Sequence, residues 1–210
     1  MSKLYIVGTP IGNLGDLSPR ARETLETADF IAAEDTRVTL KLLNHFGISK
    51  PMVSYYQHNL RERGEEIVNR IAAGESCALV TDAGMPAISD PGEDLVRLCA
   101  QRGIETVSVP GPTAALTALA LSGLSTSRFT FEGFLSTSRQ SRKEHLDSLR
   151  AERRTMIFYE APHKLRTTLG DLLEAFGDRK IALCRELTKL HEEVIRTTLE
   201  GAVERYRETA

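Results

Sequence analysis

The stretch CALVTDAGMPAISDPG, residues 77–92, places an apolar run directly before a loop rich in glycine and proline. The run at residues 77–80 is typical of a strand that is buried on both faces of a parallel sheet. Ligands of open α/β sheets bind beyond the carboxyl ends of the strands. The loop that starts at Thr81 therefore predicts either a ligand-binding edge or a plain structural turn, and this pattern alone leaves both interpretations open.

The residue types in this loop suit a binding surface made of main chain. Gly84 leaves no side chain between the backbone and a bound molecule, and Pro86 fixes φ near about −65°. Asp82, at the end of the strand, can accept hydrogen bonds from hydroxyl or amino groups.

Strand and helix patterns alternate on both sides of this loop. Ser18 is a typical N-cap residue, and Pro19 is typical of the first position of a helix. Gly47 and Gly103 are typical of helix ends. We expect strands at residues 4–7, 30–33, 52–55, 77–80 and 105–109, and helices at residues 19–27, up to Gly47, at 61–73 and at 92–102. This order predicts an α/β protein with a mainly parallel sheet in its first domain, residues 1–122.

The pattern changes after the Pro-Gly-Pro of residues 110–112 and the small-residue helix expected at 114–121. We place the domain boundary near Gly123, so that residues 123–210 form a second α/β domain. Its expected strands are 129–134, 156–159, 181–184 and 194–198, and its expected helices are 143–153, 164–176 and 199–207.

Composition excludes several classes of protein. The chain has 210 residues, 41% of them hydrophobic, a net charge of −2 and no apolar stretch long enough to span a membrane. Three cysteines without CxxC spacing predict reduced thiols in a cytoplasmic protein and no metal site. The loop at residues 8–15 lacks the lysine of a P-loop, which disfavours nucleoside triphosphate binding.

Basic residues gather at the start of the second domain. Between Arg128 and Arg154 there are seven Arg or Lys residues against four acids. We expect a flexible loop at residues 136–142, whose Ser, Thr and Arg side chains suit phosphate contacts. A solvated surface loop is the alternative.

Eight motifs, in one order, resemble the ribosomal RNA small subunit methyltransferase I family of the tetrapyrrole methylase superfamily. They are LYIVGTPIGNLGDLSPRA (4–21), FIAAEDTR (30–37), LLNHFGI (42–48), LVTDAGMPAISDPG (79–92), VPGPTAALTAL (109–119), FEGFL (131–135), FYEAPHKL (158–165) and RELTK (185–189).

The resemblance implies a cytidine 2′-O-ribose methyltransferase that acts on 16S rRNA within the small ribosomal subunit. It implies S-adenosyl-L-methionine as methyl donor, a homodimer, and two α/β/α domains with the ligand cleft between them. The donor-binding residues that it implies are Pro10, Asp82, Ala83, Gly84, Ile88, Thr113, Ala114, Ala115 and Tyr159.

The chain departs from the family pattern at two places. The segment FLSTSRQSRKE lacks the usual Pro and Lys-rich run, so we expect RNA contacts based on Arg and Ser. The chain stops at Ala210, where we expect related sequences to add a final strand and a small module. The residues expected to contact RNA are Arg37, His58, Arg139, Arg142, Lys143 and Arg185.

Methyl transfer to a ribose hydroxyl needs alignment and one proton acceptor. Asp35 and Glu160, each following a strand, are the expected catalytic residues, while Glu34, Asp82, His58 and His163 stay open as alternatives. Two other functions also stay open. One is methylation of a small molecule such as a tetrapyrrole, and the other is RNA binding without catalysis.

Overall fold

The computed structural model describes residues 2–207, and the chain divides into two compact units, residues 1–114 and 115–210. The α/β fold class expected from the sequence is confirmed, with a parallel sheet in the first unit. Cys77 and Cys99 are buried, Cys184 is half-buried, and all three are free thiols.

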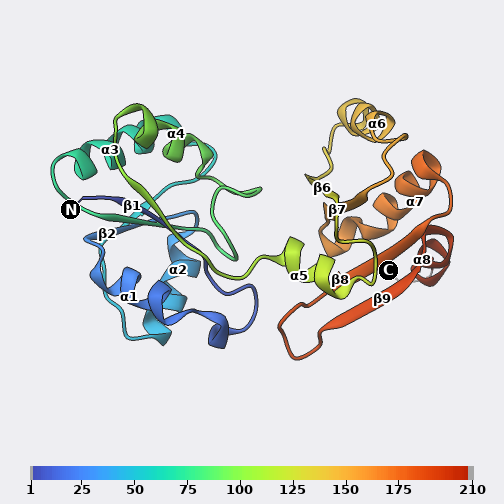
Figure 1. The fold of residues 1–210 in the computed structure, drawn as a ribbon, viewed down its shortest axis with the longest axis horizontal. Coiled ribbons are helices and arrows are strands. Elements are labelled where there is room, and N and C mark those ends of the chain that lie inside the picture. Colours follow the sequence, from blue (N-terminus) through green and yellow to red (C-terminus); the bar gives the residue numbers. More distant parts are fainter. Residues whose placement is uncertain (1, 208–210) are drawn as a thin grey trace. The chain divides into compact units, whose positions relative to one another are not determined.

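The first unit is a three-layer α/β/α structure around five parallel strands in the order β3-β2-β4-β1-β5 (Figure 1). The strands are β1 (Leu4–Val7), β2 (Phe30–Ala33), β3 (Met52–Ser54), β4 (Cys77–Val80) and β5 (Thr106–Val109). The helices are α1 (Pro19–Thr27), α2 (Thr36–His45), α3 (Leu60–Ala72) and α4 (Glu93–Gln101), with a 3₁₀ turn η1 at Leu14–Asp16.

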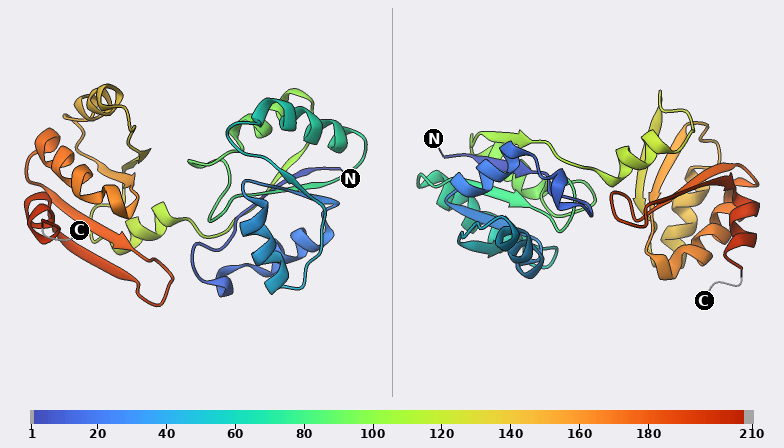
Figure 2. Two further views of the ribbon diagram at one scale, coloured as in Figure 1. Left: turned by 180° about the vertical axis from the view of Figure 1, so that it is seen from behind. Right: turned by 90° about the horizontal axis from the view of Figure 1, so that it is seen from below.

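Each face of this sheet has its own hydrophobic core. On one face, Ile67 of α3 and Leu95 of α4 pack against Leu79 of β4. On the other face, Leu25 of α1 and Leu43 of α2 pack in the second core, and the left view of Figure 2 shows the two pairs of helices on opposite sides of the sheet. Strands buried on both faces explain the uninterrupted apolar runs in the sequence.

Local signals set the helix ends in this unit. The Ser18 hydroxyl accepts a hydrogen bond from Ala21 N at 3.0 Å, and Pro19 is the first residue of α1, as predicted. Asp35 caps α2 by accepting from Arg37 N at 2.8 Å.

The second unit contains two small sheets. Strands β6 (Phe129–Phe134) and β7 (Thr155–Tyr159) are parallel, and β8 (Lys180–Arg185) and β9 (Glu193–Thr198) form an antiparallel hairpin. Its helices are α5 (Ala114–Leu121), α6 (Arg139–Ser148), α7 (Leu165–Phe176) and α8 (Leu199–Arg205), with a 3₁₀ turn η2 at Pro162–Lys164. Its core joins Leu169 of α7 to Leu199 of α8.

The division between the units falls at Ala114/Ala115, whereas the sequence placed it near Gly123. Helix α5 belongs to the second unit because its backbone bonds to that unit's side chains. Ala115 N donates to the Tyr159 hydroxyl at 3.0 Å, and Arg196 Nη2 donates to the Leu121 carbonyl at 2.6 Å.

Helix α6 differs from the expectation in its position. It begins at Arg139 and ends at Ser148, so residues 139–142 are helical and not part of a loop. Arg, Gln, Lys and Glu are good helix formers, and Ser138 sits at the N-cap in extended conformation. Arg139, Arg142 and Lys143 therefore stand on a helix rather than on a flexible loop.

Candidate active site

The loops that follow β1 and β4 are joined through their main chains. Thr9 N donates to the Gly84 carbonyl at 2.9 Å, and Gly84 N donates to the Thr9 carbonyl at 3.1 Å. The buried Thr9 hydroxyl also donates to the carbonyl of Thr81 at 3.2 Å. On the other side of β1, Gly8 N donates to the Val109 carbonyl at 3.0 Å. The carboxyl ends of β4, β1 and β5 thus form one connected edge.

Close backbone contact at this edge requires glycine. A Cβ on Gly8 would lie 2.6 Å from the Gly111 Cα, and a Cβ on Gly111 would lie 2.8 Å from the Gly8 Cα. Gly84 has φ +94°, and a Cβ there would lie 3.5 Å from Ile11 Cγ2 and from the Pro112 carbonyl. The sequence predicts that the space beside Gly84 receives a ligand. In the structure, the Ile11 side chain and the Pro112 carbonyl lie beside this space.

The loop after β4 has an unusual backbone. Ala87 has φ +68° and Ser89 has φ +62°, and both are residues that seldom adopt positive φ. Ile88 lies between them and is 53% exposed. Such conformations persist only where the surrounding structure holds them, and they cluster at ligand-binding sites.

Carboxylates gather at the ends of β2 and β4. Glu34 Oε2 accepts a hydrogen bond from the buried Thr81 hydroxyl at 2.6 Å, and Asp82 Oδ1 accepts from Asp35 N at 3.2 Å. Partial desolvation and the charge of Glu34 raise the pKa of Asp82. Desolvation, again followed by the charge of Glu34, raises the pKa of Asp90 to about 6. Burial first, and then the neighbouring Glu34 carboxylate, therefore disfavours the ionised forms of Asp82 and Asp90.

Asp90 was missed in the sequence interpretation. It lies in the quoted loop, before Pro91, and a carboxylate in a candidate binding loop is a usable signal. Its coupling to Glu34 could not be found in this way, because the two residues are brought together only by the pairing of β2 with β4.

Asp35 is held by a different partner. Its Oδ1 accepts from Arg37 Nε at 3.0 Å, and its Oδ2 accepts from Arg37 Nη2 at 2.6 Å. The Arg37 guanidinium lowers the pKa of Asp35 to about 2, with a further contribution from the Arg37 backbone N–H. The Arg37 side chain is 87% exposed, so this pair presents a fixed guanidinium at the edge.

The remaining candidate donor-binding residues of the first unit differ in exposure. Pro10 is buried, Asp82 and Ala83 are exposed, and Thr113 and Ala114 are half-buried. The structure brings Pro10 and Gly84 together through the paired loops, and Pro112, which precedes Thr113, contacts the same place. A ligand at this edge would meet the exposed Asp82 and Ala83, whereas Gly84 and Pro10 are buried.

In the second unit, Tyr159 lies in an aromatic cluster. Its ring centroid is 5.1 Å from that of Phe131 and 5.4 Å from that of Phe134, and its hydroxyl accepts from Ala115 N. Two donor-site candidates, Ala115 and Tyr159, are thus in direct contact. Glu160 accepts hydrogen bonds from Ala161 N at 2.8 Å and from the buried Thr168 hydroxyl.

The basic candidates of the second unit are mostly paired with acids. Arg142 Nε donates to Asp171 Oδ2 at 2.5 Å and its Nη2 to Thr168 Oγ1 at 2.7 Å, and the side chain is only 15% exposed. The other pairs are Lys143 with Asp147 at 2.9 Å and Arg185 with Glu193 at 2.5 Å. Within residues 2–207, Arg139 has no acidic partner, so it is the candidate most available to a phosphate.

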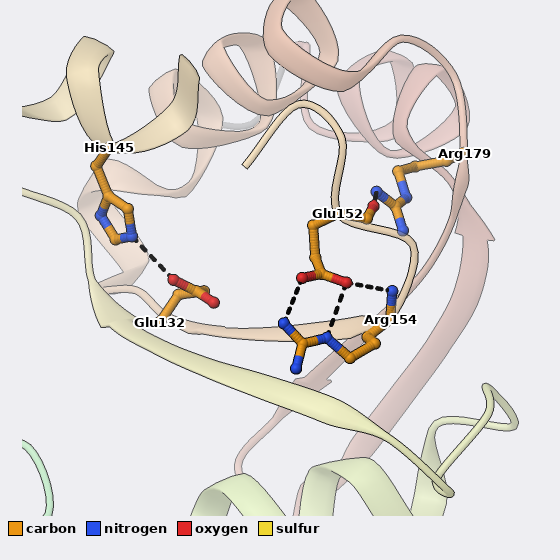
Figure 3. Close-up of polar contacts among 5 residues, drawn as sticks. All are labelled: Glu132, His145, Glu152, Arg154 and Arg179. Atoms are coloured by element: carbon orange, nitrogen blue, oxygen red, sulfur yellow. Dashed lines mark hydrogen bonds and ion pairs between the residues drawn. The ribbon is translucent and has the colours of Figure 1, made fainter. Parts of the chain in front are cut away.

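A second polar cluster lies between β6 and α6 (Figure 3). Glu132, in the irregular register between Phe131 and Gly133, lies 2.9 Å from His145 Nε2 through its Oε2. Nearby, Glu152 binds Arg154 through two side-chain hydrogen bonds, and the Glu152 carbonyl accepts from Arg179. The Arg154 guanidinium lowers the pKa of Glu152 to about 2. These ion pairs were not anticipated from the sequence.

Across the described part of the chain, no group of three His, Cys, Asp or Glu side chains is arranged to hold a metal ion. No helix among residues 2–207 has the length and apolarity needed to cross a bilayer.

The family model of the Tetrapyrrole (Corrin/Porphyrin) Methylases matches residues 3–203. The chain belongs to the tetrapyrrole methylase family. The family resemblance inferred from the eight motifs is thereby confirmed, and known tetrapyrrole methylases allow a direct comparison.

Two relatives within the tetrapyrrole methylases are similar over nearly the whole chain, and both are named ribosomal RNA small subunit methyltransferase I. The protein of Synechocystis sp. is 54% identical, over 97% of this chain and 73% of its own length. That of Thermotoga maritima is 48% identical, over 98% of this chain and 92% of its own length.

Solved tetrapyrrole methylase structures share the fold at low identity. Cobalt precorrin-4 methyltransferase has a TM-score of 0.71 at 19% identity, over 98% of this chain and 89% of its own. Uroporphyrin-III C-methyltransferase from Thermus thermophilus, in complex with S-adenosyl homocysteine, has a TM-score of 0.67 at 18% identity, over 99% of this chain and 93% of its own. At these identities the likeness establishes the fold.

Proposed function

We propose that this chain transfers a methyl group from S-adenosyl-L-methionine to the ribose 2′-hydroxyl of a cytidine in 16S rRNA of the small ribosomal subunit. The observation that carries the proposal is the similarity, near 50% identity over almost the whole chain, to proteins named ribosomal RNA small subunit methyltransferase I. The 2′-hydroxyl and the cytidine come from the motif resemblance alone.

The connected edge of the first unit fits the donor. The Gly8–Gly111 approach and the Thr9–Gly84 pairing hold three loops in place. Asp82 offers an exposed carboxylate to ribose hydroxyls or an amino group, and exposed Ile88 offers apolar surface. We assign donor binding to Pro10, Asp82, Ala83, Gly84, Ile88, Thr113 and Ala114 of this unit. The motif resemblance adds Ala115 and Tyr159, which contact each other within the second unit.

The electrostatics of this edge favour a cationic ligand. Asp82 and Asp90 have raised pKa values, in both cases through desolvation and then the charge of Glu34. A positive ligand would relieve this repulsion and hold the carboxylates ionised. When bound, the donor supplies an activated methyl group on a positively charged sulfur, and it also carries an ammonium group.

The residues of the chain then have to orient the RNA hydroxyl and accept its proton. Of the two carboxylates predicted as catalytic, Asp35 and Glu160, we keep Glu160 as a candidate proton acceptor and propose a positioning role for Asp35. The pKa of Asp35 is about 2, so it is a weak proton acceptor and serves best by fixing Arg37 toward the RNA. Asp90, with a pKa of about 6, is better matched to proton transfer near neutral pH.

We propose RNA contacts for residues of each unit. Arg37 follows β2 and His58 follows β3, which are neighbouring strands of the first unit, and both residues are exposed. On the second unit, Arg139 and Lys143 share the first turns of α6, and Arg185 ends β8. Phosphate contacts of this kind position an RNA without reading its sequence.

The decisive experiment is methyl transfer from labelled S-adenosyl-L-methionine to small ribosomal subunits isolated from cells that lack the enzyme. Label in a single 2′-O-methylcytidine of 16S rRNA is expected. Label that appears only in a tetrapyrrole would overturn the proposal. Calorimetry with S-adenosyl-homocysteine tests donor binding on its own. A chain that binds RNA but does not bind S-adenosyl-homocysteine would be an RNA-binding module without catalysis.

A homodimer and a cytoplasmic location accompany the proposal. Light scattering at micromolar concentration tests the dimer. A molar mass equal to that of the monomer would contradict the proposed homodimer.

A further inference from the structure

The loop that follows β3 presents an aromatic side chain to solvent. Tyr55 is fully buried, whereas the next residue, Tyr56, is 40% exposed. The ring of Tyr56 meets the ring of His58 edge to face, with centroids 5.9 Å apart and planes at 78°. An exposed tyrosine that is supported on one side by a second ring offers its other surface to a flat partner.

This loop is held in shape by one asparagine. Asn59 Oδ1 accepts from Tyr56 N at 2.9 Å, and Asn59 Nδ2 donates to the Ser54 carbonyl at 3.1 Å. Asn59 N donates in addition to the Tyr56 carbonyl at 2.9 Å. The backbone that carries Tyr56 is therefore ordered before any ligand arrives, which lowers the entropy lost on binding.

The position of the loop connects it with the candidate active site. Strands β2 and β3 are neighbours, Ala33 pairs with Ser54, and Tyr55 N donates to the Ala33 carbonyl at 2.8 Å. Tyr56 therefore leaves the sheet at the same edge as the Asp35–Arg37 pair, whose guanidinium is exposed. A ring for stacking and a cation for a phosphate thus stand at adjacent strand ends.

We propose that Tyr56 stacks on an unpaired base of the RNA substrate, while Arg37 and His58 face the adjoining phosphates. This inference rests on the proposed function, since it names how that substrate is held. Proteins recognise unpaired RNA bases largely by stacking on aromatic side chains, and stacking tolerates any base. Tyr56 is then a substrate-positioning residue that the sequence interpretation did not include.

The test compares Tyr56→Ala, Tyr56→Phe and Arg37→Ala with the parent chain. Phe129→Ala is the matched control, because Phe129 is an aromatic residue of similar exposure, 38% against 40%. For each variant we would measure affinity for small-subunit RNA at several salt concentrations, affinity for S-adenosyl-homocysteine, and kcat and KM for methylation.

Tyr56→Ala should weaken RNA binding by about 5- to 100-fold, the loss typical of one stacked base, and should leave the salt dependence unchanged. Tyr56→Phe should restore binding, since it keeps the ring. Arg37→Ala should instead reduce the slope of log K against log salt by about 1. Affinity for S-adenosyl-homocysteine should stay at the parent value in all variants.

Several results would overturn the inference alone. The first is RNA binding by Tyr56→Ala that equals that of the parent or of Phe129→Ala. The second is failure of Tyr56→Phe to restore RNA binding. The third is a loss of S-adenosyl-homocysteine affinity in Tyr56→Ala as large as its loss of RNA affinity. A parent chain that binds no RNA would overturn the proposed function and this inference together.

Discussion

The main chains of Thr9 and Gly84 bind each other through two reciprocal hydrogen bonds, of 2.9 Å and 3.1 Å. This bridge connects the loop after β1 to the loop after β4, and Gly84 makes it with φ +94°. The candidate donor site is therefore a property of paired loops rather than of one motif.

Gly84→Val tests this connection. A β-branched residue is strongly disfavoured at φ +94°, at a cost of roughly 1–3 kcal/mol, and its Cβ would lie in van der Waals contact with Ile11 and Pro112, in the space proposed for the donor. We expect affinity for S-adenosyl-homocysteine to fall at least about tenfold, while the protein still melts cooperatively at a lower temperature.

Gly74→Val is the matched control for Gly84→Val. Gly74 also has positive φ, +114°, but no neighbouring atom lies within 4 Å of its Cβ position. It should lower the melting temperature and keep donor affinity. Parent-like donor affinity in Gly84→Val would show that this loop is not the donor site.

Asp90→Asn tests the electrostatics of the edge. The pKa of Asp90 is raised from 3.8 to about 6 in the folded chain. Between these values the folded chain binds more protons than the unfolded chain, so this group lowers the free energy of unfolding as the pH rises. Asp90→Asn should raise the melting temperature at pH 7 by roughly 2–6 °C, and the gain should disappear below about pH 4.

Thermal melts from pH 3.5 to 8 measure this effect. Asp16→Asn removes an exposed carboxylate of η1 and controls for the change in net charge. A gain in Asp90→Asn that is the same at all pH values would contradict the raised pKa of Asp90.

Asp35→Asn separates positioning from proton transfer. Asparagine can still cap α2 but no longer pairs ionically with Arg37. If Asp35 holds Arg37 for the RNA, KM for RNA should rise about 5- to 20-fold with kcat nearly unchanged. If Asp35 accepts the proton, kcat should instead fall by roughly 100-fold or more. We expect the first pattern, because the pKa of Asp35 is about 2. Steady-state kinetics on small subunits would distinguish the two.

The basic side chains of α6 should fall into two classes. Arg139→Ala with Lys143→Ala should flatten the plot of log K against log salt by about 2 units for RNA, without changing donor affinity. Arg142→Ala should lower the melting temperature instead, because Asp171 and Thr168 would lose their partly buried partner. An unchanged salt slope in the double variant would mean that α6 is only a solvated surface.

Local signals in the sequence account for the order of strands and helices. Apolar runs such as residues 4–7 and 77–80 indicate strands buried on both faces, and Ser18 with Pro19 indicates a helix start. The family motifs are likewise contiguous segments, so the resemblance is visible in the sequence alone. The start of α6 was displaced because its Ser- and Arg-rich sequence is compatible with a loop and with a helix.

Which polar groups meet depends on the tertiary fold. The coupling of Asp90 to Glu34, the Gly8–Gly111 approach and the burial of Arg142 beside Asp171 all join residues far apart in the chain. No local propensity encodes such contacts, because they depend on strand order and on how helices pack. The sequence therefore identifies residues that can do chemistry, whereas their charge state and their freedom to meet a ligand follow from neighbours that the fold supplies.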